Sequence, residues 1–209
     1  MKKLIFGIAL MVAGALFAYA QQYCPESDFR IEPVGGGVSI RIVAYVGNNW
    51  TVRIPPVIRN LPVTHIGSNA FMGRTLTSVT IPNSVTHIES GRMLSGRLQS
   101  GAFFNNQLTS VIIPDSITYI GVGAFSRNLL SSVTIPDNVS VGIEAFFENE
   151  LTEITIGENV ALGRGFDSWH ALFPYSFNRT VDRHYNQHGR VARIYHRGDT
   201  GGWRWRYRR

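Results

Sequence analysis

Apolar residues recur along the middle of the chain at a spacing of 21 to 22 residues in three consecutive copies. Within each copy, β-branched residues alternate with other positions, which predicts a short strand with one buried side. The apolar positions of the most complete copy are Leu108, Val111, Ile113, Ile117 and Ile120. The copies that begin at Leu76, Leu130 and Leu151 repeat the leucine and both strand positions. A fixed period of this kind predicts stacked repeats.

Each predicted strand is followed by a turn, and an Ala-Phe pair recurs in phase with the copies. In three copies the strand ends in Ile-Pro-Asn or Ile-Pro-Asp, where proline cannot donate to a ladder; Gly157 replaces the proline in the fourth copy. One small and one large side chain then fill the interior. The pairs are Ala70-Phe71, Ala102-Phe103, Ala124-Phe125 and Ala145-Phe146. Because one unit cannot bury its apolar face alone, we predict a right-handed solenoid, α/β or mainly β, with a parallel sheet along one face.

One repeat contains an insertion of about ten residues between Glu89 and Gly101. The distance from Ile81 to Phe103 is 22 residues, whereas Ile113 to Phe125 is 12. The added stretch repeats Ser-Gly at a five-residue step. We expect a bulged loop here, and both a harmless surface extension and a functional feature stay open, since long surface insertions cost little stability.

The repeats are flanked by two different terminal segments. Residues 29–46 hold Gly35, Gly36 and Gly37 between alternating apolar runs, which predicts a hairpin that caps the open end of the solenoid. We therefore expect a signal peptide over residues 1–20, an N-terminal β cap over 21–49, the solenoid over 50–165, and a basic, aromatic cap or tail resembling a β-hairpin over 166–209.

The first twenty residues have the composition of a secretory signal peptide. Lys2 and Lys3 precede an apolar stretch over residues 4–17, and Ala18-Tyr19-Ala20 provides a small-x-small cleavage site. The stretch is shorter than the roughly 20 residues that span a bilayer. We predict export across an inner membrane to the periplasm, the cell surface or the medium. The single cysteine, Cys24, excludes an intrachain disulfide framework, and whether it is a free thiol or an acylated residue stays open.

Charge is distributed unevenly along the chain. A content of 44% hydrophobic and 16% charged residues excludes a fully disordered polymer, and the formal net charge is +6. Residues 179–209 hold nine arginines and two acids, whereas residues 21–178 hold nine arginines and twelve acids. The tail is either a capping hairpin or a basic, aromatic strip for anionic surface polymer, lipid headgroups or an acidic protein patch. Its candidate residues are Arg190, Arg193, Arg197, Trp203, Arg204, Trp205 and Arg206.

The repeat from Leu108 to Phe125 resembles the bacterial BspA-type leucine-rich repeat, also called the Treponema pallidum type. The resemblance covers about Asn60 to Gly163. It implies a leucine-rich-repeat solenoid and adhesion to host extracellular-matrix proteins or to other bacteria. Gly157 and the insertion depart from the pattern and affect the local shape of the coil.

The outward positions of the predicted strands form a flat, mostly hydroxyl face without a pocket, which suits extended contact with a protein or polysaccharide. These candidate binding residues are Thr51, Arg53, Ser78, Thr80, Ser110, Ile112, Ser132, Thr134, Glu153 and Thr155.

We find no catalytic or metal-binding constellation in the sequence. His65 and His87 occupy equivalent repeat positions that we expect to face solvent, and no further ligand completes a set around His184 and His188. We therefore predict a protein that is not an enzyme and has no cofactor.

Two functions stay open. The first is a secreted or cell-surface adhesion protein that binds through the repeat face. The alternative is a periplasmic or envelope interaction module that docks on an acidic partner through its basic tail. A secreted chain seldom meets nucleic acid as its ligand, so we expect none.

Overall fold

The computed structural model describes residues 23–95, 97–162, 193–197 and 203–207. The predicted signal peptide over residues 1–20 lies outside the described residues. Within the described part, the only helices are two short 3₁₀ turns, η1 (Glu26–Asp28) and η2 (Gly35–Gly37), and all other regular elements are strands. None of the described helices is long and apolar enough to cross a membrane.

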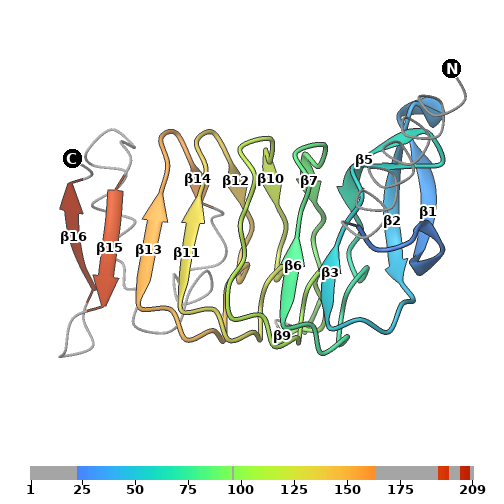
Figure 1. The fold of residues 1–209 in the computed structure, drawn as a ribbon. Helices are drawn as coiled ribbons and strands as arrows, with labels where there is room; N and C mark the ends of the chain where they lie inside the picture. The colour runs from blue at the N-terminus through green and yellow to red at the C-terminus, as the bar shows by residue number, and fades with distance from the viewer. Residues whose placement is uncertain (1–22, 96, 163–192, 198–202, 208–209) are drawn as a thin grey trace, which may run out of the picture.

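The chain forms a solenoid. Each coil contributes one strand segment to the sheet whose outward side chains are the predicted binding residues. In this article the strand face is the outer side of β3 (Thr51–Arg53), β6 (Ser78–Thr80), residues 110–112, β11 (Ser132–Ile135) and β13 (Glu153–Ile156). Strands β3 and β6 pair in parallel, as do β11 and β13 (Figure 1). The predicted solenoid with a parallel sheet is confirmed.

The structure adds a second parallel sheet on the other side of the coils, which we call the second ladder. It runs from β2 (Ser39–Tyr45) through β5 (Leu61–Ile66), β7 (His87–Ile88), β10 (Tyr119–Ile120) and β12 (Ser140–Val141) to β14 (Ala161–Leu162). The short strand β4 (Val57–Ile58) pairs antiparallel with β5. Most second-ladder strands are only two residues long, too short for a period-two pattern to predict them.

The strand predicted over residues 110–113 is not a regular strand. Only one isolated parallel bridge, between Thr80 and Ile112, connects this segment to its neighbour. Its backbone forms no ladder with β11. The outward sheet is therefore interrupted between β6 and β11.

A continuous stack of aromatic rings runs through the core. Neighbouring centroids are 5.5 Å apart between Tyr45 and Phe71, 4.9 Å between Phe71 and Phe103, and 5.0 and 5.4 Å in the next two steps. The phenylalanines of the four Ala-Phe pairs are all completely buried. Burying such a ring contributes about 2 kcal/mol. The role predicted for the Ala-Phe pairs as interior filling is confirmed.

Three asparagine side chains, of which Asn106 and Asn128 are buried and Asn149 is half-buried, connect successive coils beside this stack. The Asn128 amide donates to the carbonyl oxygens of Phe103 and Phe125, and its side-chain oxygen accepts from the backbone N–H of Leu108. Asn106 and Asn149 make the equivalent bonds in their own coils. Each amide thereby satisfies backbone groups that the turn leaves without ladder partners.

The N-terminal cap is an antiparallel hairpin of β1 (Phe29–Val34) and β2. Gly36 has a φ of 71° in the turn, a left-handed conformation that suits glycine. Strand β2 then pairs in parallel with β5, so the hairpin continues the second ladder. Cys24 is a half-buried free thiol beside the core, and its backbone N–H donates to the Arg53 carbonyl.

The opposite end of the solenoid is extended by a second hairpin. Strands β15 (Arg193–Arg197) and β16 (Trp203–Tyr207) pair antiparallel, and β15 also pairs antiparallel with β13 (Figure 1). The hairpin-like tail predicted from the sequence is confirmed for these backbone segments. Arg190 lies outside the described residues.

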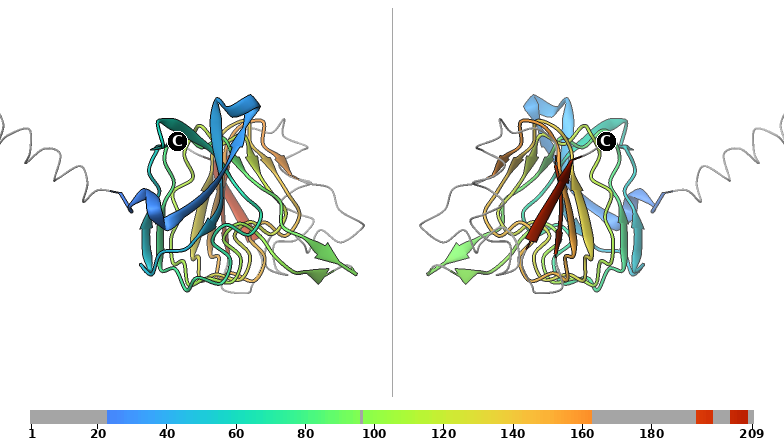
Figure 2. Two further views of the ribbon diagram at one scale, coloured as in Figure 1. Left: turned by 90° about the vertical axis from the view of Figure 1, so that its right-hand side faces the viewer. Right: turned by 90° about the vertical axis from the view of Figure 1, so that its left-hand side faces the viewer.

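The insertion forms a hairpin where a bulged loop was expected. Strands β8 (Met93–Leu94) and β9 (Arg97–Leu98) pair antiparallel, and Figure 2 shows this green hairpin projecting from the side of the coils. Its two ends meet at the solenoid, because a Cβ on Gly91 would lie 1.8 Å from the Ser100 carbonyl oxygen. We call it the insert hairpin.

Candidate functional site

The predicted binding residues of the strand face alternate with core residues. Val52, Val79, Val133 and Ile154 point inward and are buried. Ser78, Glu153 and Thr155 are partly exposed. The remaining predicted residues are exposed on the strand face: Thr51, Arg53, Thr80, Ser110, Ile112, Ser132 and Thr134.

Ile112 is the apolar exception on this hydroxyl-rich face. Its side chain is 82% exposed, although it is a large hydrophobic residue. Next to it, a shallow depression of about 230 Å³ lies between residues 110–113 and residues 132–134 of β11. The prediction of a face without a pocket is therefore wrong at this place, where the outward sheet is interrupted.

The strand face and the C-terminal hairpin belong to one sheet. Its strand order is β11, β13, β15 and β16. In register, Glu153 pairs with His196, which pairs with Arg204, and Thr155 pairs with Ile194, which pairs with Arg206. The register thus places two tail candidates, Arg204 and Arg206, in line with strand-face positions, whereas Arg193, Arg197, Trp203 and Trp205 alternate with these positions along β15 and β16. The described backbone includes all the tail candidates except Arg190.

His65 and His87 lie on the second ladder and stack on one another, with ring centroids 4.6 Å apart. The Thr86 hydroxyl donates to the Thr64 carbonyl, so its oxygen accepts from Nδ1–H of His87 at 2.8 Å. Burial lowers the pKa of His65, and the neighbouring His87 lowers it further. Both rings are half-buried, so these positions face solvent only in part.

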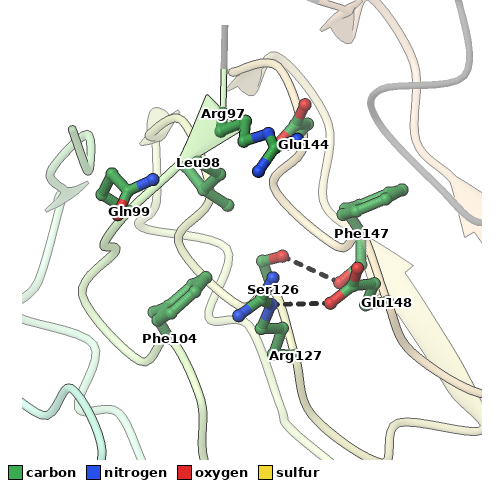
Figure 3. Close-up of a pocket in the computed structure, with 9 residues that line it drawn as sticks. All are labelled: Arg97, Leu98, Gln99, Phe104, Ser126, Arg127, Glu144, Phe147 and Glu148. Carbon is green, nitrogen blue, oxygen red and sulfur yellow. Dashed lines mark hydrogen bonds and ion pairs between the residues drawn. The ribbon is translucent and has the colours of Figure 1, made fainter. Parts of the chain in front are cut away.

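A second concave site, which sequence reasoning missed, lies beside the insert hairpin. The pocket has a volume of about 490 Å³ and lies between the hairpin and the turns that follow the Ala-Phe pairs (Figure 3). Leu98 packs over Gly123, where an added Cβ would lie 2.4 Å from the leucine side chain. Arg97, Gln99, Phe104, Ser126, Arg127, Glu144, Phe147 and Glu148 complete the lining.

Two charged residues are paired inside this pocket. The Arg127 guanidinium lies 5.2 Å from the centre of the Phe104 ring, and its Nε is 2.6 Å from a carboxylate oxygen of Glu148. Glu144 forms no ion pair with any residue that the structure describes. Burial raises the pKa of the Glu144 carboxyl, and the Glu148 carboxylate raises it further, against the opposing effect of Arg127.

Comparison with protein-family models decides the family. The BspA-type leucine-rich repeat matches residues 57–164 in six copies, slightly more than half of the chain. The chain belongs to the BspA-type leucine-rich repeat family. This confirms the resemblance inferred from the Ile-Pro-Asp and Ala-Phe patterns. Comparison with curated proteins finds no match.

Three solved structures of leucine-rich repeat proteins are similar to this BspA-type chain. The leucine-rich repeat protein of Treponema pallidum is 19% identical, with 80% of this chain and 96% of that chain covered, at a TM-score of 0.49. A leucine-rich repeat protein from Bacteroides ovatus is 21% identical, with 64% and 42% covered and a TM-score of 0.42. A leucine-rich cell surface protein from Faecalibacterium prausnitzii is 18% identical, with 87% and 60% covered and a TM-score of 0.30.

Membership of the BspA-type family implies a role in protein binding, because leucine-rich repeats generally serve as non-catalytic scaffolds for protein interaction. Among the described residues, no three His, Cys, Asp or Glu side chains are grouped so that they could hold a metal ion. His184 and His188 lie outside those residues.

Proposed function

We propose that this BspA-type protein is a secreted or cell-surface adhesion protein that binds host matrix proteins or other cells through its strand face. The observation that carries the proposal is the continuity of this face with the basic hairpin. A hydroxyl-rich ladder with the exposed Ile112 lies on the same sheet as β15 and β16. The combined surface offers area, one apolar anchor and an arginine-rich end.

These three features act on different steps of binding. Arginines steer an acidic partner toward the surface and raise the association rate at low salt. Hydroxyl groups accept and donate hydrogen bonds over an extended contact, and a buried anchor such as Ile112 slows dissociation. An extended, open surface of this kind suits a polymeric or fibrous partner better than a small molecule.

The adhesion proposal is tested with purified protein on immobilised fibronectin, immobilised fibrinogen and intact bacterial cells. We expect saturable binding to at least one of them, weakened by added salt. Absence of binding to all three would overturn adhesion. Fractionation of the native cell should place the protein at the surface or in the medium, and a purely periplasmic location would contradict display.

The alternative, an envelope module that docks through its tail, makes a different prediction. Deleting residues 179–209 would also expose the edge of β13, since β15 pairs with it. Substituting Arg204→Gln and Arg206→Gln changes only the charge. Under the alternative this variant detaches from the envelope, whereas under adhesion it stays at the surface and binds its target more slowly.

A further inference from the structure

The pocket beside the insert hairpin is built from two parts of the chain that the repeat pattern does not bring together. One wall is the insert hairpin, with Leu98 of β9 and the adjacent Gln99, and the other is the pair of turns that follow Phe125 and Phe146. Figure 3 shows Phe104 and Phe147 on either side of the opening, with Arg127 and Glu148 between them. This site lies away from the strand face and does not depend on the function proposed for it.

Two arginines and two glutamates line the pocket, and one of the carboxylates, that of Glu144, forms no ion pair among the described residues. Arg127 is occupied by Glu148, 2.6 Å away. Arg97 is exposed on the insert hairpin and makes no ion pair with Glu144. Glu144 is half-buried and forms no ion pair among the described residues, although Arg127 acts on it electrostatically. A carboxylate in that setting gains from an incoming positive charge.

Glu144, Arg127 and Glu148 have left-handed backbone conformations, and earlier coils have glycine or asparagine at the equivalent positions. Glu144 has a φ of 55°, where the preceding coil has Gly123 at 64°. Arg127 and Glu148 have φ values of 56° and 52°, where earlier coils place Gly73 and Asn105. Left-handed backbone disfavours arginine and glutamate relative to glycine and asparagine. Three strained positions with long charged side chains thus converge on one cavity, a pattern typical of functional sites.

We propose that this pocket is a second binding site, which takes a basic side chain, lysine or arginine, from a partner polypeptide. The ammonium or guanidinium group pairs with Glu144, and its stem packs against the partly exposed Phe147 ring and Leu98. Aromatic faces favour cations as well as apolar stems. The insert hairpin, which carries the exposed Met93 and Leu94 beyond the pocket, provides further apolar contact to the same partner.

The test is a titration of the isotope-labelled protein, followed by amide NMR shifts. The probes are lysine and arginine capped as N-acetyl methylamides, with capped norleucine as the uncharged control and capped glutamate as the anionic one. We expect the two basic probes to shift the amide signals of Gln99, Ser126 and Phe147 saturably. Norleucine should bind about tenfold more weakly or not at all. Glutamate binding more tightly than lysine would overturn the proposal.

Variants assign the effect to Glu144. Glu144→Gln and Glu144→Asn should each weaken lysine binding about tenfold, whereas the exposed Glu150→Gln, with the same charge change on the same coil, should leave it within twofold. Arg97→Gln should tighten lysine binding, because it removes a like charge at the rim. Unchanged binding in both Glu144 variants, or weaker binding in Arg97→Gln, would contradict the proposal. The strand-face adhesion assay is independent of all these results.

Discussion

Asn128 donates a hydrogen bond from its side-chain amide to the carbonyl oxygen of Phe103 on the preceding coil, at 2.9 Å. The same side chain also bonds Phe125 and Leu108, so one buried residue satisfies backbone groups of two coils. The ladder of asparagines is therefore a structural element of the solenoid that connects successive coils beside the ring stack.

Replacing Asn128 by leucine should destabilise the protein strongly. The change keeps the volume similar but leaves the buried Leu108 N–H without a partner. It also removes one of the two asparagine donors from each of the Phe103 and Phe125 carbonyls, which keep Asn106 and Asn149. We expect a cost of about 2 kcal/mol in the free energy of unfolding. Chemical denaturation followed by circular dichroism measures this. The exposed Asn83→Leu is the control and should change stability by less than about 0.5 kcal/mol. Equal effects of the two substitutions would refute the role of the ladder.

Removing the insert hairpin should leave the solenoid folded. Deletion of residues 91–100 joins Ser90 to Gly101 and produces Ile-Glu-Ser-Gly-Ala-Phe, which matches Ile-Gly-Val-Gly-Ala-Phe at residues 120–125. The backbone ends of the hairpin already touch, so the cut requires little rearrangement. We expect an unchanged circular dichroism spectrum, a melting temperature within a few degrees, and loss of the capped-lysine NMR shifts. An unfolded deletion variant would mean that the hairpin is part of the core.

The native protein should have a lower free energy of unfolding with Glu144 than with asparagine at this position. Glu144→Asn removes a half-buried carboxylate and places a residue that tolerates left-handed backbone at a φ of 55°. We expect a gain of about 0.5 kcal/mol in the free energy of unfolding at neutral pH. Glu150→Asn, at an exposed position nearby, should give no gain. Destabilisation by Glu144→Asn would show that the glutamate is structural.

Stability should fall on acidification because of His65. The pKa of His65 is lowered in the folded state by burial and by His87, so below its ordinary value near 6.5 the unfolded chain binds more protons. The contribution of His65 to stability is complete above that value and is lost as the pH falls toward the folded-state pKa. Urea unfolding at pH 7.5 and 5.5 measures the difference. His65→Tyr, which copies Tyr119, should reduce it; an unchanged difference would contradict this cause.

The features that were predictable from the sequence are those that depend only on residues within one repeat. Val133 and Ile135 alternate, and Phe125 follows Ala124, so their burial follows from local periodicity. The asparagine ladder had a signal that was overlooked: Asn106, Asn128 and Asn149 each stand three residues after the phenylalanine of an Ala-Phe pair.

Other features depend on which segments meet across coils, and the repeat alone does not specify this. The pocket exists because the inserted Leu98 reaches Gly123 in the following coil. The depression beside Ile112 exists because residues 110–113 do not pair with β11, although their sequence has the same alternation as their neighbours. The continuity of the tail with the strand face likewise required the pairing of β15 with β13.

The most direct test of the central claim compares the two sides of the solenoid in binding to immobilised fibronectin and fibrinogen. One variant carries Ile112→Glu and Thr134→Glu on the strand face, and the other carries Thr118→Glu and Ser140→Glu at exposed positions on the side of the second ladder. Both add two negative charges to exposed residues. We predict that the strand-face variant binds at least about tenfold more weakly and that the other stays within twofold of the unmodified protein. Weakened binding by the second variant alone, or equal losses by both, would contradict the claim.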